Sequence, residues 1–284
     1  MRIINLLALS LLLCCWCGSE DHSYYVSPDP EPPPDVDLWP RWCPADTAAI
    51  AYTHVAQTLE ELRQLGTYSI WVVDVPSGAK RFVASGVAHD WTPDGRSILF
   101  CRDGGLWTID IGTAAAARLL SSTFCGGPRF SPDGTRVSLT KGTRPDAGTW
   151  IASLNPVEER WISRRFASDW SPDGSRLICD SLVIIAPDGI RIGTVPHSSA
   201  IGYASDASWS PNGASLAVTG RGPAIYVVRI DGSGEKVVVK PGAVPSWSPD
   251  GSKIAYGAIS EDRKGMVIWT VSKDGTEKHQ LTYP

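Results

Sequence analysis

The chain has 284 residues, a formal net charge of −4 and 20% charged residues. Proteins that bind nucleic acid present clustered Lys and Arg, and the basic residues here are scattered, so the sequence argues against a nucleic-acid partner. The 12 Trp, 27 Gly and 22 Pro are typical of an all-β chain rich in turns.

Residues 1–14 have the order of a signal peptide. Arg2 is followed by an apolar run and then by cysteines, as in export signals. The run is shorter than the about 20 apolar residues that span a membrane. Small Cys14 stands directly before Cys15, and Leu12 lies three positions before it. This order predicts a bacterial lipoprotein, lipidated at Cys15, in the periplasm or on the outer membrane. Plain secretion and an uncleaved anchor are the alternatives.

Residues 15–38 are predicted to form a flexible tether. The segment "SPDPEPPPDVD" (residues 27–37) is acidic and rich in Pro, so it favours extended conformations and cannot build a core. It would hold the remainder of the chain away from a membrane.

Residues 39–284 carry an internal repeat. Each copy has an aromatic anchor, a Ser-Pro-Asp-Gly turn or a variant of it, and a strand of alternating apolar residues, as in "SWSPDGSKIAY" (Ser246 to Tyr256). Pro, Asp and Gly at these places form a tight turn, so each copy predicts a hairpin. The copies recur about every 40 residues. Their anchors are Trp42, in a degenerate first copy, and Trp91, Phe130, Trp170, Trp209 and Trp247.

Two further strands follow each hairpin. The third is apolar, as in "IYVVRI" (Ile225 to Ile230), and the fourth is more polar, as in "EKVVVK" (Glu235 to Lys240). Four short antiparallel strands in such a unit describe one propeller blade. The sequence therefore predicts an all-β, six-bladed β-propeller of four-stranded blades, and the anchor Trp side chains are expected to pack between blades.

The Trp-Ser-Pro-Asp-Gly phrase followed by a β-branched strand resembles the repeat of the TolB-type, WD-like propeller family. The resemblance covers residues 39–284 and implies a periplasmic role in envelope integrity, since TolB engages a peptidoglycan-associated lipoprotein. TolB carries an additional N-terminal α/β domain that this sequence lacks, so a full-length TolB is not expected. Many unrelated functions use this scaffold.

The residue before each anchor differs from copy to copy. These positions read Arg41, Asp90, Arg129, Asp169, Ser208 and Ser246. On innermost strands they would line the central channel, where charges of alternating sign either pair between blades or form a binding mouth. In the second case His89, beside Asp90, would contribute.

Other chemistry has little support. The sequence has no G-x-S-x-G elbow and no H-E-x-x-H zinc motif, and no cofactor is expected. The turn aspartates are expected to cap turns, because Asn212 replaces Asp in one copy. Buried packing is expected for Cys179, and an exported protein permits a disulfide between Cys101 and Cys125.

The sequence thus favours a non-enzymatic, monomeric envelope scaffold whose partner is another envelope protein or a peptide. It would touch the membrane only through its lipid anchor. The alternative is a propeller lyase or hydrolase that uses His89, Asp90, Arg129 and Asp169 at the channel mouth.

Overall fold

A computed structural model describes residues 36–56, 61, 67–121, 126–142 and 147–283. The predicted signal peptide, Cys15 and most of the predicted tether lie outside these residues. The described residues contain no helix long and apolar enough to cross a membrane.

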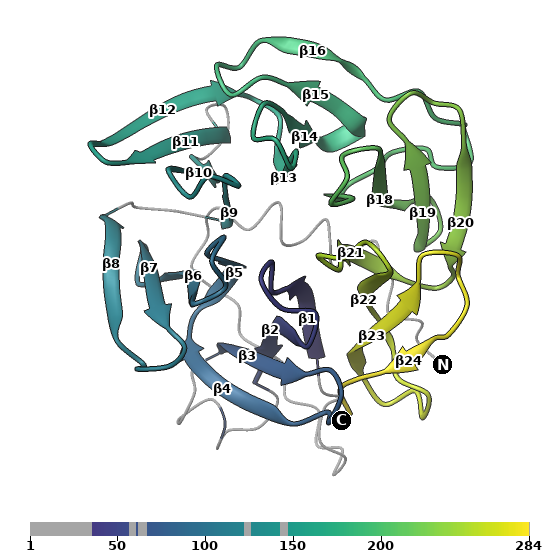
Figure 1. Cartoon of the computed structure of the whole chain (residues 1–284), viewed down its shortest axis with the longest axis horizontal. Coiled ribbons are helices and arrows are strands. Elements are labelled where there is room, and N and C mark those ends of the chain that lie inside the picture. The colour runs from purple at the N-terminus through teal and green to yellow at the C-terminus, as the bar shows by residue number, and fades with distance from the viewer. Residues whose placement is uncertain (1–35, 57–60, 62–66, 122–125, 143–146, 284) are drawn as a thin grey trace, which may run out of the picture.

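The strands are arranged in a ring, with each repeat running from the centre to the periphery (Figure 1). The inner strands are β1 (Val36–Trp42), β5 (Val87–Trp91), β9 (Gly126–Phe130), β13 (Ala167–Trp170), β17 (Ala207–Trp209) and β21 (Ala243–Trp247). The second strands are β2 (Ala49–Val55), β6 (Ser97–Arg102), β10 (Arg136–Lys141), β14 (Leu177–Cys179), β18 (Ser215–Gly220) and β22 (Lys253–Ile259).

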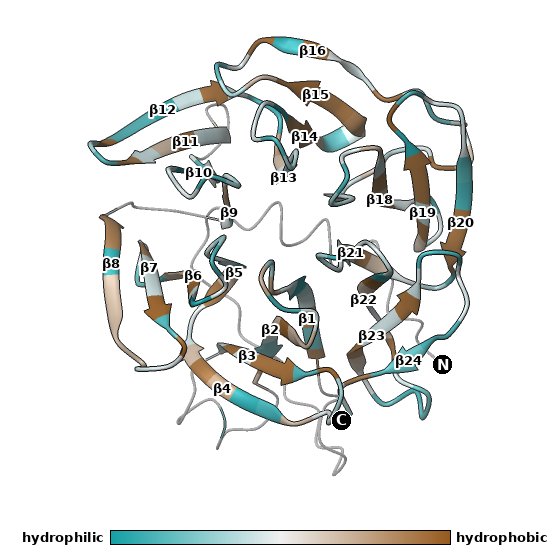
Figure 2. Cartoon of the chain, in the orientation of Figure 1, coloured by the Kyte–Doolittle hydropathy of each residue, from teal (hydrophilic) through white to brown (hydrophobic). Residues whose placement is uncertain are grey.

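The remaining strands lie farther from the centre. The third strands are β3 (Tyr68–Asp74), β7 (Gly105–Asp110), β11 (Gly148–Leu154), β15 (Val183–Ile185), β19 (Ala224–Arg229) and β23 (Met266–Ser272). The outer strands are β4 (Lys80–Ser85), β8 (Ala116–Ser121), β12 (Val157–Ser163), β16 (Arg191–Thr194), β20 (Glu235–Val239) and β24 (His279–Gln280). Figure 2 shows hydrophobic third strands such as β15 and β19, and hydrophilic stretches on the outer strands β12, β16 and β20.

The prediction of six separate four-stranded blades is wrong. Four sheets are separate four-stranded antiparallel blades, formed by β5–β8, β9–β12, β13–β16 and β17–β20. The strands of the first and last repeats instead belong to one 8-stranded sheet. They are joined where Val36 of β1 pairs in parallel with Met266 of β23. This pairing occurs only once among the described strands, so the repeat pattern of the sequence could not predict it.

The Ser-Pro-Asp-Gly turns form as the sequence predicts. In the turn of the third repeat, Asp133 Oδ1 accepts hydrogen bonds from Ser131 Oγ at 2.5 Å and from the Thr135 backbone N–H at 3.0 Å. Gly134 has a φ of 70°, which Gly adopts without strain. Asn212 Oδ1 accepts the equivalent bonds from Ser210 Oγ at 2.8 Å and from the Ala214 N–H at 3.0 Å. The capping role of these residues is confirmed.

The turn glycine also lies against the preceding repeat. A Cβ on Gly134 would lie 3.6 Å from Pro93 Cγ, and one on Gly174 would lie 3.6 Å from Pro132 Cδ. The same order recurs where Gly251 faces Pro211. The Pro of one turn therefore packs over the Gly of the next turn, so these turns also form contacts between neighbouring repeats.

The hydrophobic core lies between successive repeats. One cluster joins Ile178 and Leu182 of the fourth repeat to Trp209 and Leu216 of the fifth. Another joins Trp42 and Tyr52 of the first repeat to Ile268 and Leu281 of the last. The anchor tryptophans are buried, as predicted: Trp42, Trp91, Trp170, Trp209 and Trp247.

Candidate functional site: the inner ring

The inner ring consists of the residues that precede the anchor aromatics. At four of these places the side chain accepts a hydrogen bond from the backbone N–H of the next repeat's anchor. The acceptors and donors are Asp90 Oδ2 with Phe130 at 2.9 Å, Asp169 Oδ2 with Trp209 at 2.9 Å, Ser208 Oγ with Trp247 at 3.2 Å, and Ser246 Oγ with Trp42 at 3.2 Å. The last of these bonds joins the two ends of the ring.

The two arginines are bonded to the next repeat through their backbone carbonyls, because a guanidinium group accepts no hydrogen bond. The backbone carbonyl of Arg41 accepts from Trp91 Nε1 at 3.0 Å, and the carbonyl of Arg129 accepts from Trp170 Nε1 at 3.1 Å. Each inner-ring residue is therefore bonded to the following repeat, through either its side chain or its carbonyl.

The inner-ring charges do not form the ion pairs expected between neighbouring blades. Among the described residues, the ion pairs within 4.0 Å include none of Arg41, Asp90, Arg129 and Asp169. Asp90 and Asp169 accept hydrogen bonds from backbone N–H groups instead of pairing with the neighbouring guanidinium groups.

Within the described residues, the side chain of Arg129 donates only to backbone carbonyls. Its Nε bonds the Ser168 carbonyl at 3.1 Å, and Nη1 bonds the carbonyls of His89 at 3.1 Å and Pro128 at 2.7 Å. Burial lowers the pKa of Arg129 to about 10, and the positive charge of Arg41 acts in the same direction. At neutral pH the group stays charged, and it connects β5, β9 and β13.

Two inner carboxylates are disfavoured by their surroundings. Burial raises the pKa of Asp169, and the charges of Arg41 and Arg129 oppose this rise. Burial also raises the pKa of Asp206. The Ser205 hydroxyl, which donates to Asp206 Oδ2 at 2.8 Å, and the charges of Arg41 and Arg129 oppose this rise.

Asp206 was missed in the sequence, although it carried a signal. It stands two residues before Ser208, and residues two apart in an extended chain face the same side. Asp206 therefore belongs with the inner ring.

His89 lies between the first and second repeats. It is 2% exposed, and its Nδ1 lies 3.0 Å from Thr53 Oγ1 on β2. Burial and the charges of Arg129 and Arg41 lower the pKa of His89 to about 3, so the imidazole is neutral at physiological pH. Its Nε2 is buried and has no hydrogen-bond partner among the described residues.

Arg41 differs from the other members of the ring. Arg41 is 8% exposed, and its Nε atom is buried with no hydrogen-bond partner in the part of the chain that the structure describes. The structure thus brings Arg41, Asp90, Arg129 and Asp169 together on adjacent inner strands and adds Asp206.

The cysteines are not part of this ring. Cys43 and Cys179 are free and buried, and burial raises the pKa of the Cys179 thiol to about 12, so this thiol is unreactive. Cys101 is disulfide-bonded. Cys125, named with Cys101 in the sequence prediction, lies outside the described residues.

Comparison with known proteins identifies the fold. No protein-family model matches the sequence, and no curated protein matches it. TolB from Acinetobacter baumannii superposes with a TM-score of 0.66 at 16% identity, over 86% of this chain and 62% of that chain. The putative TolB from Agrobacterium tumefaciens gives a TM-score of 0.65 at 19% identity, over 75% of this chain and 88% of that chain. The fold is that of a TolB-like β-propeller.

The structure of an enzyme also resembles this chain. An oligogalacturonate lyase in complex with manganese has a TM-score of 0.55 at 12% identity, over 86% of this chain and 76% of that chain. At such identities the likeness establishes the fold alone. In the described part of this TolB-like propeller, no group of three or more His, Cys, Asp or Glu side chains could hold a metal ion.

Proposed function

We propose that this chain is a binding scaffold of the bacterial cell envelope that holds another protein or a peptide on its outer surface. The observation that carries the proposal is an apolar patch between the outer strands β8 and β12. We call Leu119, Leu120, Val157, Glu159 and Trp161 the outer patch.

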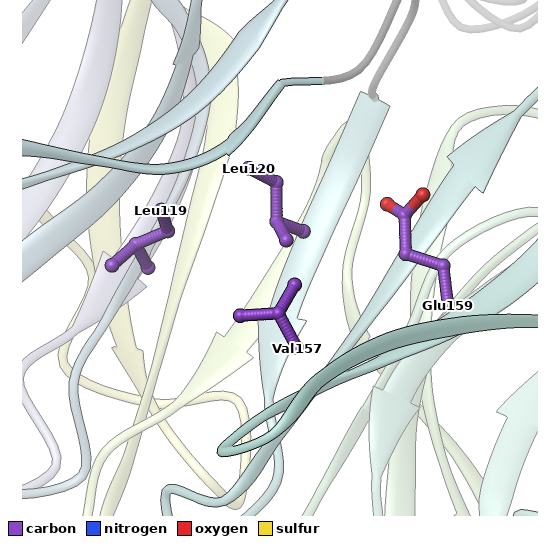
Figure 3. A pocket seen from close by; sticks show the side chains of 4 residues that line it. All are labelled: Leu119, Leu120, Val157 and Glu159. Atoms are coloured by element: carbon purple, nitrogen blue, oxygen red, sulfur yellow. The ribbon is translucent and has the colours of Figure 1, made fainter.

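The outer patch surrounds a cavity of about 280 Å³, lined by Leu119, Leu120, Val157 and Glu159. Figure 3 shows Leu119, Leu120 and Val157 gathered on one side, with the Glu159 carboxylate beyond them. Val157 and Trp161 are 58% and 44% exposed. Val157, Glu159 and Trp161 alternate along β12 and so share one face of the strand.

This arrangement suits a protein partner. Interfaces are enriched in aromatic anchors that sit beside small apolar pockets and are surrounded by polar groups. The polar rim is supplied here by Glu159, which accepts from Lys141 Nζ at 2.6 Å. A binding role is also what the resemblance of the repeat to the TolB-type family implies.

The test is capture of a partner from solubilised envelopes by the tagged full-length chain. Trp161→Ala combined with Val157→Ser should abolish capture, whereas Phe82→Ala should not, because Phe82 is a comparably exposed aromatic on the distant strand β4. The free energy of unfolding should change by less than about 0.5 kcal/mol for Trp161→Ala, a surface substitution. Equal capture by the patch variant and the native chain would disprove this site.

The proposal also includes the localisation of the protein. Lipidation at Cys15 would place the propeller beside a membrane, with the Pro-rich tether as spacer. Globomycin should make the precursor accumulate, and Cys15→Ala should move the protein to the soluble fraction. Unchanged membrane partitioning of Cys15→Ala would exclude this anchor.

A further inference from the structure

A second surface lies at the end of the ring opposite the Ser-Pro-Asp-Gly turns. Those turns join inner strands to second strands, so in antiparallel blades the loops that leave the second strands, and those that enter the next inner strand, lie at the other end. Five residues of these loops form what we call the basic patch. Arg164 and Arg165 precede β13, Asp180 follows β14, Tyr203 precedes β17 and Arg221 follows β18.

Direct contacts join the members of the basic patch. Asp180 Oδ1 accepts from Arg165 Nη1 at 3.1 Å, and Asp180 Oδ2 accepts from the Tyr203 hydroxyl at 3.3 Å. Gly202, next to Tyr203 in the chain, lies against Arg221, since a Cβ on Gly202 would be 3.6 Å from Arg221 Cβ. Loops of the fourth and fifth repeats therefore form one continuous surface.

The turn that presents Asp180 is strained. Ser181 and Leu182, which follow it, have φ values of 55° and 54°, and a bulky residue such as Leu rarely adopts this left-handed conformation. Leu182 is fully buried, and the Ser181 N–H donates to the Ala204 carbonyl at 3.0 Å, so packing and bonding hold the turn in this form. Strained residues cluster at binding and switch sites. Here the strained turn sets Asp180 between its two donors.

The basic patch carries positive charge that the described residues do not neutralise. It has three guanidinium groups and one carboxylate. Arg164 and Arg221 are exposed, and their side chains form no hydrogen bond or ion pair with any described residue. Tyr203 is 60% exposed. Tyr and Arg are the residues that contribute most at protein interfaces, and a positive surface on a chain of net charge −4 favours an acidic partner.

We propose that the basic patch binds an acidic segment of another protein, with carboxylates on its arginines and an apolar side chain against Tyr203. A carboxylate matches the planar fork of a guanidinium group, which makes two parallel hydrogen bonds to it. An anionic lipid surface would cover the whole patch and be repelled by Asp180, whereas a peptide can leave Asp180 uncovered. The proposal goes beyond the outer patch, whose residues lie on β8 and β12.

Peptide selection on the full-length chain tests the proposal. A random peptide library displayed on phage is first depleted on the triple arginine variant, Arg164→Gln with Arg165→Gln and Arg221→Gln, and then selected on the native chain. The proposal expects the selected peptides to carry more Asp and Glu than Lys and Arg, together with an apolar residue. Selected peptides without this acidic excess would overturn it, as would failure to select any peptide.

Isothermal titration calorimetry with one selected peptide then locates the contacts. Tyr203→Ala and the single change Arg221→Gln, which removes no hydrogen bond to a described residue, should each weaken binding about tenfold. Arg176→Gln and Arg191→Gln remove exposed guanidinium groups near the other end of the ring and should leave the dissociation constant unchanged. Equal binding by Arg221→Gln, Tyr203→Ala and the native chain would contradict the assignment.

Vesicles and the outer patch provide the last controls. In the Cys15→Ala background, phosphatidylglycerol vesicles should sediment the native patch and the triple arginine variant equally. Sedimentation that requires the arginines would replace the protein partner by a lipid surface and overturn the proposal. The selected peptide should bind Trp161→Ala with Val157→Ser as tightly as the native chain, so failure of the outer patch would not be mistaken for failure of the basic patch.

Discussion

The aspartates of the turns and those of the inner ring come from neighbouring positions of the same repeat, yet their surroundings are opposite. Ser131 and Thr135 donate to Asp133, and their hydrogen bonds lower the pKa of this carboxyl to about 2. Asp173 is held in the same way, at about 2. Burial instead raises the pKa values of Asp169 and Asp206.

The difference arises from water and from the origin of the donors. A turn carboxylate stays in solvent while hydroxyl and backbone donors from its own turn stabilise its charged form. An inner carboxylate gives up solvent. Asp90 and Asp169 each receive a backbone N–H from the next repeat. Turn aspartates therefore act locally, whereas Asp90 and Asp169 act on how repeats join.

The largest expected effect is at Asp169. Asp169→Ala removes the acceptor of the Trp170 and Trp209 N–H groups, and we expect a loss of about 3 kcal/mol in the free energy of unfolding, measured by urea denaturation. Asp169→Asn keeps one carbonyl acceptor and should lose less. A loss for Asp169→Ala no larger than that for Asp133→Ala would break the comparison.

Ser246 and Ser208 form a matched pair within the inner ring. Ser246 bonds Trp42 across the junction of the chain ends, and Ser208 bonds Trp247 across an internal junction, both at 3.2 Å. Ser246→Ala and Ser208→Ala should each lower the free energy of unfolding by about 1 kcal/mol. A markedly larger loss for Ser246 would show that this junction limits the stability of the ring.

The turn aspartates should show a smaller, local effect. Asp133→Ala removes a turn cap and should cost about 1 kcal/mol or less, because the carboxylate is exposed and water replaces part of the lost bonding. Asp133→Asn should be almost neutral, since Asn212 already makes the same bonds in the fifth repeat. A large loss for the Asn variant would mean that the charge, rather than the acceptor oxygen, holds the turn.

The smallest effect is a difference in pH dependence. The lowered pKa values of Asp133 and Asp173 give stability that is present above the unfolded value of about 3.9 and is lost as the pH falls toward about 2. Asp206 has a raised pKa, so its cost is present at neutral pH and is relieved as the pH falls through its folded value.

Denaturation at a series of pH values separates these contributions. Asp133→Asn with Asp173→Asn should flatten the acid-side loss of stability, whereas Asp206→Asn should raise stability at neutral pH. A decrease in neutral-pH stability with Asp206→Asn would show that its carboxylate is stabilising in the folded state.

The sequence by itself determined the repeat, its strands and its turns. The turn phrase acts within about six residues, through the φ preference of Gly and the acceptor oxygen of Asp, so it forms wherever it occurs. Alternation predicted that Ile254 and Tyr256 share one buried face of β22, and both are buried. Ala255 on the opposite face is buried as well, so the expectation of a single buried face is wrong for this strand.

Only the tertiary structure decided how the repeats join and what the inner charges do. The pairing of Val36 with Met266, which merges the first and last repeats into one sheet, joins residues from opposite ends of the chain. Alternating charges suggested ion pairs, but Asp90 and Asp169 each lie closer to a backbone N–H of the next repeat than to any guanidinium group that could pair with them. Such contacts depend on where two separate strands come to rest in space, and a local pattern of residues does not encode that distance.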